Sequence, residues 1–144
     1  MKGAKERVRQ FKVKEAGATY SAKTGQAVHY TTGYQFSFVR DEAFVQLDDK
    51  KWDLLTEYLM DQVGSEEYIG VYIGGAETSF YTKSLKEALD YAEVFNQETI
   101  LDWKALSEGK SWEEYYIQNP TYDESAEVDY VKIIAEILQH EKKV

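Results

Sequence analysis

The stretch 68–103 constrains the fold more than any other part of the chain, because its hydrophobic pattern changes period in a definite order. Apolar residues alternate with glycine and tyrosine over residues 69–73, which is typical of a half-buried strand. Gly74-Gly75 then predicts a tight hairpin turn, since both glycines can adopt the positive φ angles that two-residue turns require. A second strand is expected over residues 78–82.

A helix and a third strand follow the hairpin. Ser84 and Glu87 have the spacing of a capping box, and the apolar residues after them recur at helical intervals. Asn96-Gln97 closes this helix, and residues 99–103 return as a short strand. The order predicts an α+β fold, with a mainly antiparallel sheet of four to six strands packed by two or three helices in a single domain.

The remaining elements are expected on both sides of this unit. The hydrophobic pattern predicts strands over 28–40 and 44–47, a helix over 49–63, a loop over 106–110, a short helix after Ser111 and a last helix over 124–142. Asp48 is the expected N-cap of the 49–63 helix, and Gly64 is its expected end.

Charge is distributed unevenly along the chain. The first 14 residues hold six basic side chains and one acidic one, whereas the whole chain carries a net charge of −9. Because residues 1–26 contain few large apolar side chains, we expect a basic, mobile N-terminal arm there, either disordered or with a short edge strand around 11–13, and a single α+β domain over 27–144. The rest of the chain, its acidic body, repels a phosphate backbone, so we expect this body not to bind duplex nucleic acid directly.

Several kinds of catalytic and metal site lack the residues they need. The chain has no cysteine, which excludes disulfides and thiolate ligands, and its two histidines, His29 and His140, are far apart in sequence. We therefore expect no catalytic residue, no metal site and no cofactor. We also expect a cytoplasmic protein without a membrane span, since no signal-peptide or transmembrane pattern is present and the lack of cysteine suits a reducing compartment.

Four acids in the 49–63 helix recur every four residues: Asp49, Asp53, Glu57 and Asp61. Like charges at this spacing weaken a helix slightly, so helix stability does not explain them. They form either a solvated face, a recognition surface for a basic partner or a divalent-cation site. Together with Tyr115 and Tyr116 they are the candidate partner-binding residues, because tyrosine is enriched at protein interfaces.

Paired carboxylates are the one catalytic arrangement that this composition could supply. With 26 acids in the chain, chance pairs are numerous, and most are expected to be solvated. Asp102-Trp103 is a separate case, because an acid beside an aromatic residue at a strand end can become a buried carboxylate with a raised pKa.

The stretch 32–103 resembles short uncharacterised accessory proteins of temperate phages and other mobile elements. The resemblance lies in Thr32-Gly33-Tyr34-Gln35, Tyr68-Ile69-Gly70-Val71-Tyr72, Glu87-Ala88-Leu89, Phe95-Asn96-Gln97-Glu98, Ile100 and Asp102-Trp103. It carries no catalytic motif, and no functional residue can be transferred from it. It implies an inhibitor of a host defence protein, since small proteins of this kind often have that role.

Two functional hypotheses follow from these observations. The first is a small, acidic, non-catalytic protein-binding module that inhibits a protein partner, which would be basic or nucleic-acid-binding. The alternative is a small carboxylate-based enzyme, or a protein that binds a nucleotide or another small ligand in a tyrosine-lined cleft.

Overall fold

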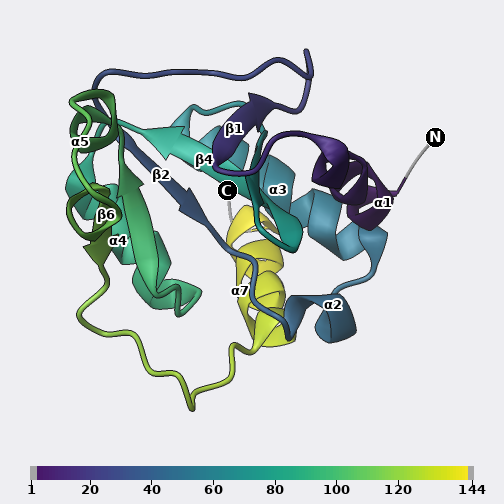
Figure 1. Cartoon of the computed structure of the whole chain (residues 1–144). Helices are drawn as coiled ribbons and strands as arrows, with labels where there is room; N and C mark the ends of the chain where they lie inside the picture. Colours follow the sequence, from purple (N-terminus) through teal and green to yellow (C-terminus); the bar gives the residue numbers. More distant parts are fainter. Residues whose placement is uncertain (1–2, 143–144) are drawn as a thin grey trace.

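A six-stranded sheet forms the centre of the computed structural model, which describes residues 3–142. The sheet has the order β1-β3-β4-β2-β5-β6, and all of its neighbouring strands are antiparallel. The strands are β1 (Ala18–Ser21), β2 (Tyr34–Ser37), β3 (Tyr68–Tyr72), β4 (Gly75–Thr82), β5 (Thr99–Asp102) and β6 (Tyr116–Gln118). The helices are α1 (Ala4–Arg9), α2 (Ala43–Gln46), α3 (Asp49–Val63), α4 (Leu85–Val94), α5 (Trp103–Ser107), α6 (Trp112–Tyr115) and α7 (Tyr130–Lys142), with a 3₁₀ helix η1 (Gln10–Val13). The predicted α+β class and single domain are confirmed (Figure 1).

Helices α3, α4 and α7 cover one face of the sheet and bury an aromatic core (Figure 1). Phe38 lies at its centre, with ring centroids 5.7 Å from Trp52 of α3 and 6.1 Å from Phe80 of β4. Phe95, next to α4, stacks on Tyr130 of α7 with ring centroids 6.2 Å apart. This face holds most of the large apolar side chains, so it accounts for most of the hydrophobic stabilisation.

Helix α3 has the ends that the sequence predicts. The Asp48 carboxylate accepts a hydrogen bond from the Lys51 backbone N–H at 2.8 Å, and Gly64 ends the helix in the left-handed region with φ 67°. Trp52 and Leu55 of its apolar stripe are fully buried. Helix α4 also begins at the predicted capping residue Ser84, because the Ser84 hydroxyl accepts from the Glu87 N–H at 3.1 Å.

The capping box of α4 is only half formed. Instead of reaching back to the Ser84 N–H, the Glu87 carboxylate accepts a hydrogen bond from the Thr82 hydroxyl at 2.6 Å. The Ser84 N–H donates to the same Thr82 oxygen at 3.1 Å. Thr82 therefore joins the end of β4 to the first turn of α4.

The N-terminal segment is part of the domain, so the prediction of a separate arm over residues 1–26 is wrong. Residues 4–13 are helical, and Ala4, Val8 and Phe11 are buried in the core. Strand β1 pairs with β3 at one edge of the sheet. The apolar residues at 4, 8 and 11 have helical spacing, and the surrounding basic residues obscured that pattern. Met1 and Lys2 of the expected arm, like the last two residues of the predicted 27–144 domain, lie outside the described residues.

Other boundaries also differ from the predictions. The segment expected as a strand over 44–47 is the short helix α2, and the strand expected over 28–40 is limited to Tyr34–Ser37. The loop expected over 106–110 overlaps helix α5. The last helix begins at Tyr130 and not at 124. The hairpin turn consists of Ile73-Gly74, because Tyr72 pairs with Gly75.

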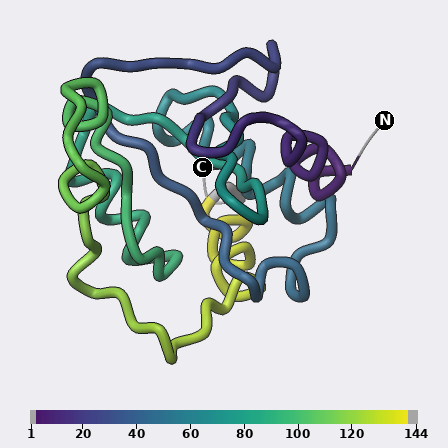
Figure 2. The backbone as a smooth tube through the Cα atoms, in the orientation of Figure 1, coloured from purple at the N-terminus to yellow at the C-terminus, as the bar shows by residue number. Residues whose placement is uncertain are grey.

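Residues 22–33 form the connection that bears most on the second face of the sheet. This connection runs from β1 across the molecule to the start of β2 beside α5 (Figure 2). At its end, the Gly33 carbonyl accepts from the Trp103 N–H at 3.0 Å. Gly33 has φ +92°, and a Cβ there would overlap the Tyr81 ring, so glycine is required at this position.

Candidate functional site

The sheet face opposite α3, α4 and α7 is polar. Because successive side chains of a strand point to opposite faces, the strand register defines which residues share this one. Thr19 lies opposite Gly70, and Gly70 lies opposite Glu77. In a neighbouring row, Ser79 lies opposite Ser37. Along these rows the second face therefore carries hydroxyl groups and a carboxylate.

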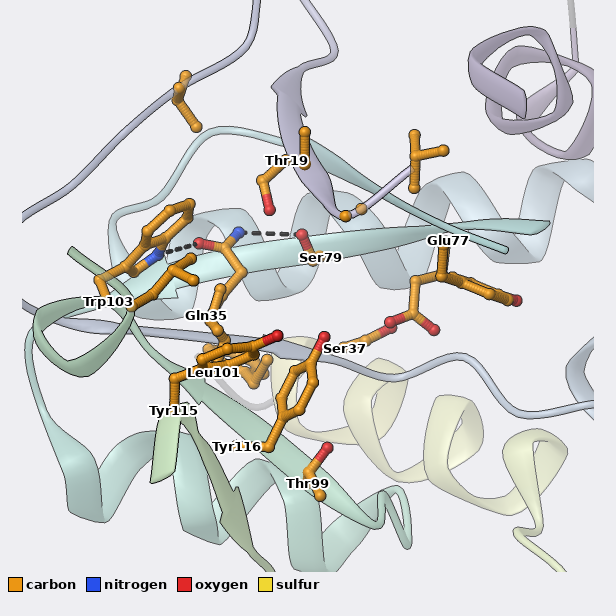
Figure 3. Close-up of a pocket in the computed structure, with 18 of the residues that line it drawn as sticks. Thr19, Gln35, Ser37, Glu77, Ser79, Thr99, Leu101, Trp103, Tyr115 and Tyr116 are labelled. Atoms are coloured by element: carbon orange, nitrogen blue, oxygen red, sulfur yellow. Dashed lines mark hydrogen bonds between the residues drawn. The ribbon is translucent and has the colours of Figure 1, made fainter. Parts of the chain in front are cut away.

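A cavity of about 210 Å³ lies over this polar face. We call it the sheet cavity, and Figure 3 shows the side chains that line it. The residues that line it include Thr19, Gln35, Glu77, Ser79, Trp103 and Tyr116. Pockets for drug-sized ligands occupy roughly 300–1,000 Å³, so the sheet cavity suits a smaller molecule.

The floor of the sheet cavity is held by a chain of buried hydrogen bonds (Figure 3). The Gln35 side-chain oxygen accepts from Trp103 Nε1 at 3.0 Å, and Gln35 Nε2 donates to Ser79 Oγ at 2.9 Å. The Ser37 hydroxyl donates to the Thr78 carbonyl at 2.6 Å. Since both ends of the Gln35 amide are bonded, its orientation is fixed without a ligand.

Among residues 3–142, Glu77 is the only carboxylate that lines the sheet cavity. Figure 3 shows its carboxylate directed from β4 toward Ser37 and Tyr116. Its side chain is half-buried, and among the described residues it has neither a hydrogen-bond donor nor a basic partner within bonding distance. Burial raises the pKa of Glu77 to about 7, because the surroundings disfavour the charged form.

Two tyrosines from α6 and β6 line the wall of the sheet cavity. The rings of Tyr115 and Tyr116 pack edge to face with centroids 4.8 Å apart, and Tyr116 is 41% exposed. Burial, and then the nearby Tyr115 and Glu77, raise the pKa of Tyr116 above its ordinary value. Its hydroxyl therefore stays protonated at neutral pH. The structure thus locates the two tyrosines predicted to bind a partner in a cavity wall.

An aromatic cluster anchors the 22–33 connection beside the sheet cavity. Tyr30 stacks on Tyr81 with ring centroids 3.9 Å apart and packs edge to face on Trp103 at 5.5 Å. Its hydroxyl is also hydrogen-bonded to that of Tyr68. The Tyr81 hydroxyl donates to the Thr32 carbonyl at 2.8 Å. These contacts hold the connection in place, and its residues Val28 and His29 line the cavity.

The predicted acidic ladder on α3 is divided between two environments. The Asp49 carboxylate accepts from the Lys5 backbone N–H at 3.0 Å, and the Asp53 carboxylate pairs with Arg7 at 2.7 Å. Both acids thus dock helix α1. Glu57 and Asp61 are exposed. The ladder belongs to the helix-covered side of the sheet, so the structure does not bring it together with Tyr115 and Tyr116 (Figure 1).

Glu77 is the central residue that sequence reasoning missed. In β4 it alternates with the core residues Ala76 and Thr78 and shares a face with Ser79. This alternation is the sequence signal that places Glu77 on the face opposite the core. Asp102, which the sequence suggested as a buried carboxylate, caps α5 by accepting from the Lys104 N–H at 3.1 Å. Within residues 3–142, no group of three or more histidine, aspartate or glutamate side chains could hold a metal ion.

Comparison of the chain with protein-family models, with curated protein sequences and with solved structures finds no match. In the described part of the chain, none of the helices has both the length and the apolar character needed to cross a membrane.

Proposed function

We propose that this protein binds a small polar organic molecule in the sheet cavity, with Glu77 as the main polar contact, and that it acts by binding and not by catalysis. The observation that carries the proposal is a cavity whose only carboxylate has no donor among the described residues. Glu77 is half-buried, and a partly desolvated carboxylate without a protein partner in a cavity is a candidate contact for a ligand.

The composition of the lining supports binding. Ligand sites typically combine apolar and aromatic walls with a few fixed polar groups that orient the ligand. The sheet cavity has walls of Leu101, Trp103 and Tyr116, and its polar groups come from rigid strands. Because Gln35 and Ser79 already hold each other, little side-chain entropy remains to be lost when a ligand enters.

The lining residues favour binding over catalysis. Paired-carboxylate hydrolysis needs two acids on either side of the substrate, and the described residues of the lining offer one. A serine nucleophile needs a hydroxyl hydrogen-bonded to a base. The Ser37 hydroxyl donates instead to a backbone carbonyl, and the Ser79 hydroxyl is hydrogen-bonded to the Gln35 amide, which is not a base.

Binding of a protein partner, including inhibition of a host defence protein, remains a prediction. The acidic surface of α3 that would bind such a partner is smaller than the sequence suggested, because Asp49 and Asp53 contact α1. Only Glu57 and Asp61 of the four acids are free of such contacts among the described residues. We place the protein in the cytoplasm, since a chain without cysteine suits a reducing compartment.

A fragment panel with cationic, neutral and anionic members tests the proposal. Ligand-observed NMR and thermal shift would be measured on the wild type and on Gly70→Val, which fills the cavity beside Glu77. A Cβ at Gly70 would lie 3.9 Å from Glu77 Cγ, an ordinary contact, so the strand should tolerate the added Cβ. Gly70→Ala provides a milder second variant.

We expect at least one class of fragment to bind the wild type, to bind Gly70→Ala more weakly and to lose binding in Gly70→Val. Far-UV circular dichroism and thermal unfolding of each variant verify that the fold is retained. A panel without any binder at millimolar concentration would count against the proposal, as would fragments that bind the wild type and both folded variants equally well.

A further inference from the structure

We infer that the ligand of the sheet cavity carries a positively charged nitrogen, as in a primary ammonium or a guanidinium group, which lies between the Glu77 carboxylate and the tyrosine rings of the wall. This inference rests on the proposed function, because it specifies the chemical class of the molecule that the cavity binds.

The charge of the lining favours a cation. In the part of the chain that the structure describes, Glu77 is the only acid that lines the sheet cavity, and no lysine or arginine lines it. His29, the one basic residue type present, is exposed. The whole chain carries a net charge of −9, so the surrounding field also attracts cations and repels anions. An anionic ligand would meet a carboxylate with no lysine or arginine in the described lining to offset it.

Hydrogen bonding leads to the same class of ligand. An ionised carboxylate has about four acceptor positions. No described residue donates to those of Glu77, so donors must come from water or from a ligand. An ammonium group supplies three donors and a guanidinium group five. Their hydrogen bonds to a carboxylate are charge-assisted and therefore roughly twice as strong as neutral ones.

The aromatic wall provides a second contact for such a group. Tyr72, Tyr115 and Tyr116 line the sheet cavity together with Glu77. Burial and the charge of Glu77 raise the pKa of Tyr72 and of Tyr116, so both rings remain neutral phenols. A cation within about 6 Å of an aromatic ring face is attracted by its quadrupole. A neutral ligand would gain neither this attraction nor an ion pair.

An organic cation fits the site better than a metal ion does. Calcium takes six to eight oxygen ligands, and magnesium is usually held through one or two carboxylates with several waters. The lining supplies one carboxylate, and within the described residues no cluster of three metal-ligating side chains exists. The volume of about 210 Å³ also exceeds what a single ion would fill.

Three probes of similar size and shape test the inference: 2-phenylethylamine, 2-phenylethanol and phenylacetate. Their affinities would be measured by NMR titration at pH 8 for the wild type, Glu77→Gln and Glu57→Gln. The last variant is the matched control, because Glu57 is an exposed glutamate of α3, the helix that covers the opposite face of the sheet. Loss of an ion pair with charge-assisted hydrogen bonds should weaken binding by about tenfold or more.

We expect the wild type to bind the amine about tenfold more tightly than the alcohol and to bind phenylacetate least. Glu77→Gln should lose the preference for the amine, and Glu57→Gln should keep it. If panel fragments bind in the cavity while the amine does not bind, or binds no better than the alcohol, the inference is wrong and the proposed function stands. If neither the panel nor these probes bind, both are wrong.

Discussion

Partial burial of a carboxylate without a protein partner opposes folding, because it removes part of the water that solvates the charge. Glu77 shows this effect, since its pKa rises from an ordinary 4.5 to about 7. The folded chain therefore binds a proton more tightly than the unfolded chain. The free energy of unfolding should fall as pH rises from about 4.5 to 7, with a total cost on the order of 3 kcal/mol above that range.

Glu77→Gln should consequently stabilise the protein, and by more at high pH. The variant removes the charge and keeps the shape, so its advantage over the wild type should grow by about 2 kcal/mol between pH 5.5 and pH 8. Urea unfolding at both pH values measures the difference, with Glu57→Gln as the control. An advantage of equal size at the two pH values, or a loss of stability at pH 8, would show that Glu77 is not a desolvated carboxylate.

The sequence predicted the roles of some residues correctly and missed others. Asp48, Gly64 and Ser84 were predicted correctly, because caps depend on neighbours within one helical turn. Glu77 was missed, since its burial depends on distant segments that cover the second face of the sheet. Tyr115 and Tyr116 were selected as candidates without any indication that they line a cavity with Glu77.

Elements with a long and regular hydrophobic pattern could be predicted from the sequence. The helix α3 has 15 residues, so its apolar stripe is repeated over several turns. Helix α1 has six residues and α2 has four, and such short segments present too few apolar positions to define a period. Short helices of this kind are stabilised by packing against the rest of the domain, which the local sequence does not reveal.

The N-terminal segment offers a matched test of that packing. Val8 is 3% exposed in the core, whereas Val13, five residues later, is 91% exposed. Val8→Ala should reduce the free energy of unfolding by roughly 2 kcal/mol, because it removes buried methyl groups and leaves a cavity. Val13→Ala should change it by less than about 0.5 kcal/mol. Both variants would be compared by urea unfolding at pH 7.

Equal and small effects of the two substitutions would indicate that α1 and η1 do not contribute to the core in solution. In that case the original expectation of a separate basic arm would be restored.

At the scale of the whole molecule, the sheet separates two environments. One face is covered by α3, α4 and α7 and holds the aromatic core, and the other is polar and carries the sheet cavity (Figure 1). The strand order β1-β3-β4-β2-β5-β6 requires β2 to lie between two strands that follow it in sequence. Alternation within a strand cannot specify such long-range neighbours, so the sequence predicted the fold class and not the position of the cavity.

The two functional hypotheses place the binding site on opposite sides of the sheet. Glu57 and Asp61, the exposed acids of the ladder, lie on α3, and Glu77 faces the sheet cavity on the other side. A measurement that locates a bound molecule can therefore distinguish them.

Chemical-shift mapping of the backbone amides is that measurement, with the strongest binder from the fragment panel titrated into ¹⁵N-labelled protein. We predict the largest changes at Thr19, Gly70 and Ser79, and changes near baseline at Glu57 and Asp61. Saturable changes confined to the exposed acids of α3, with none in the sheet cavity, would contradict the claim that the cavity is the binding site.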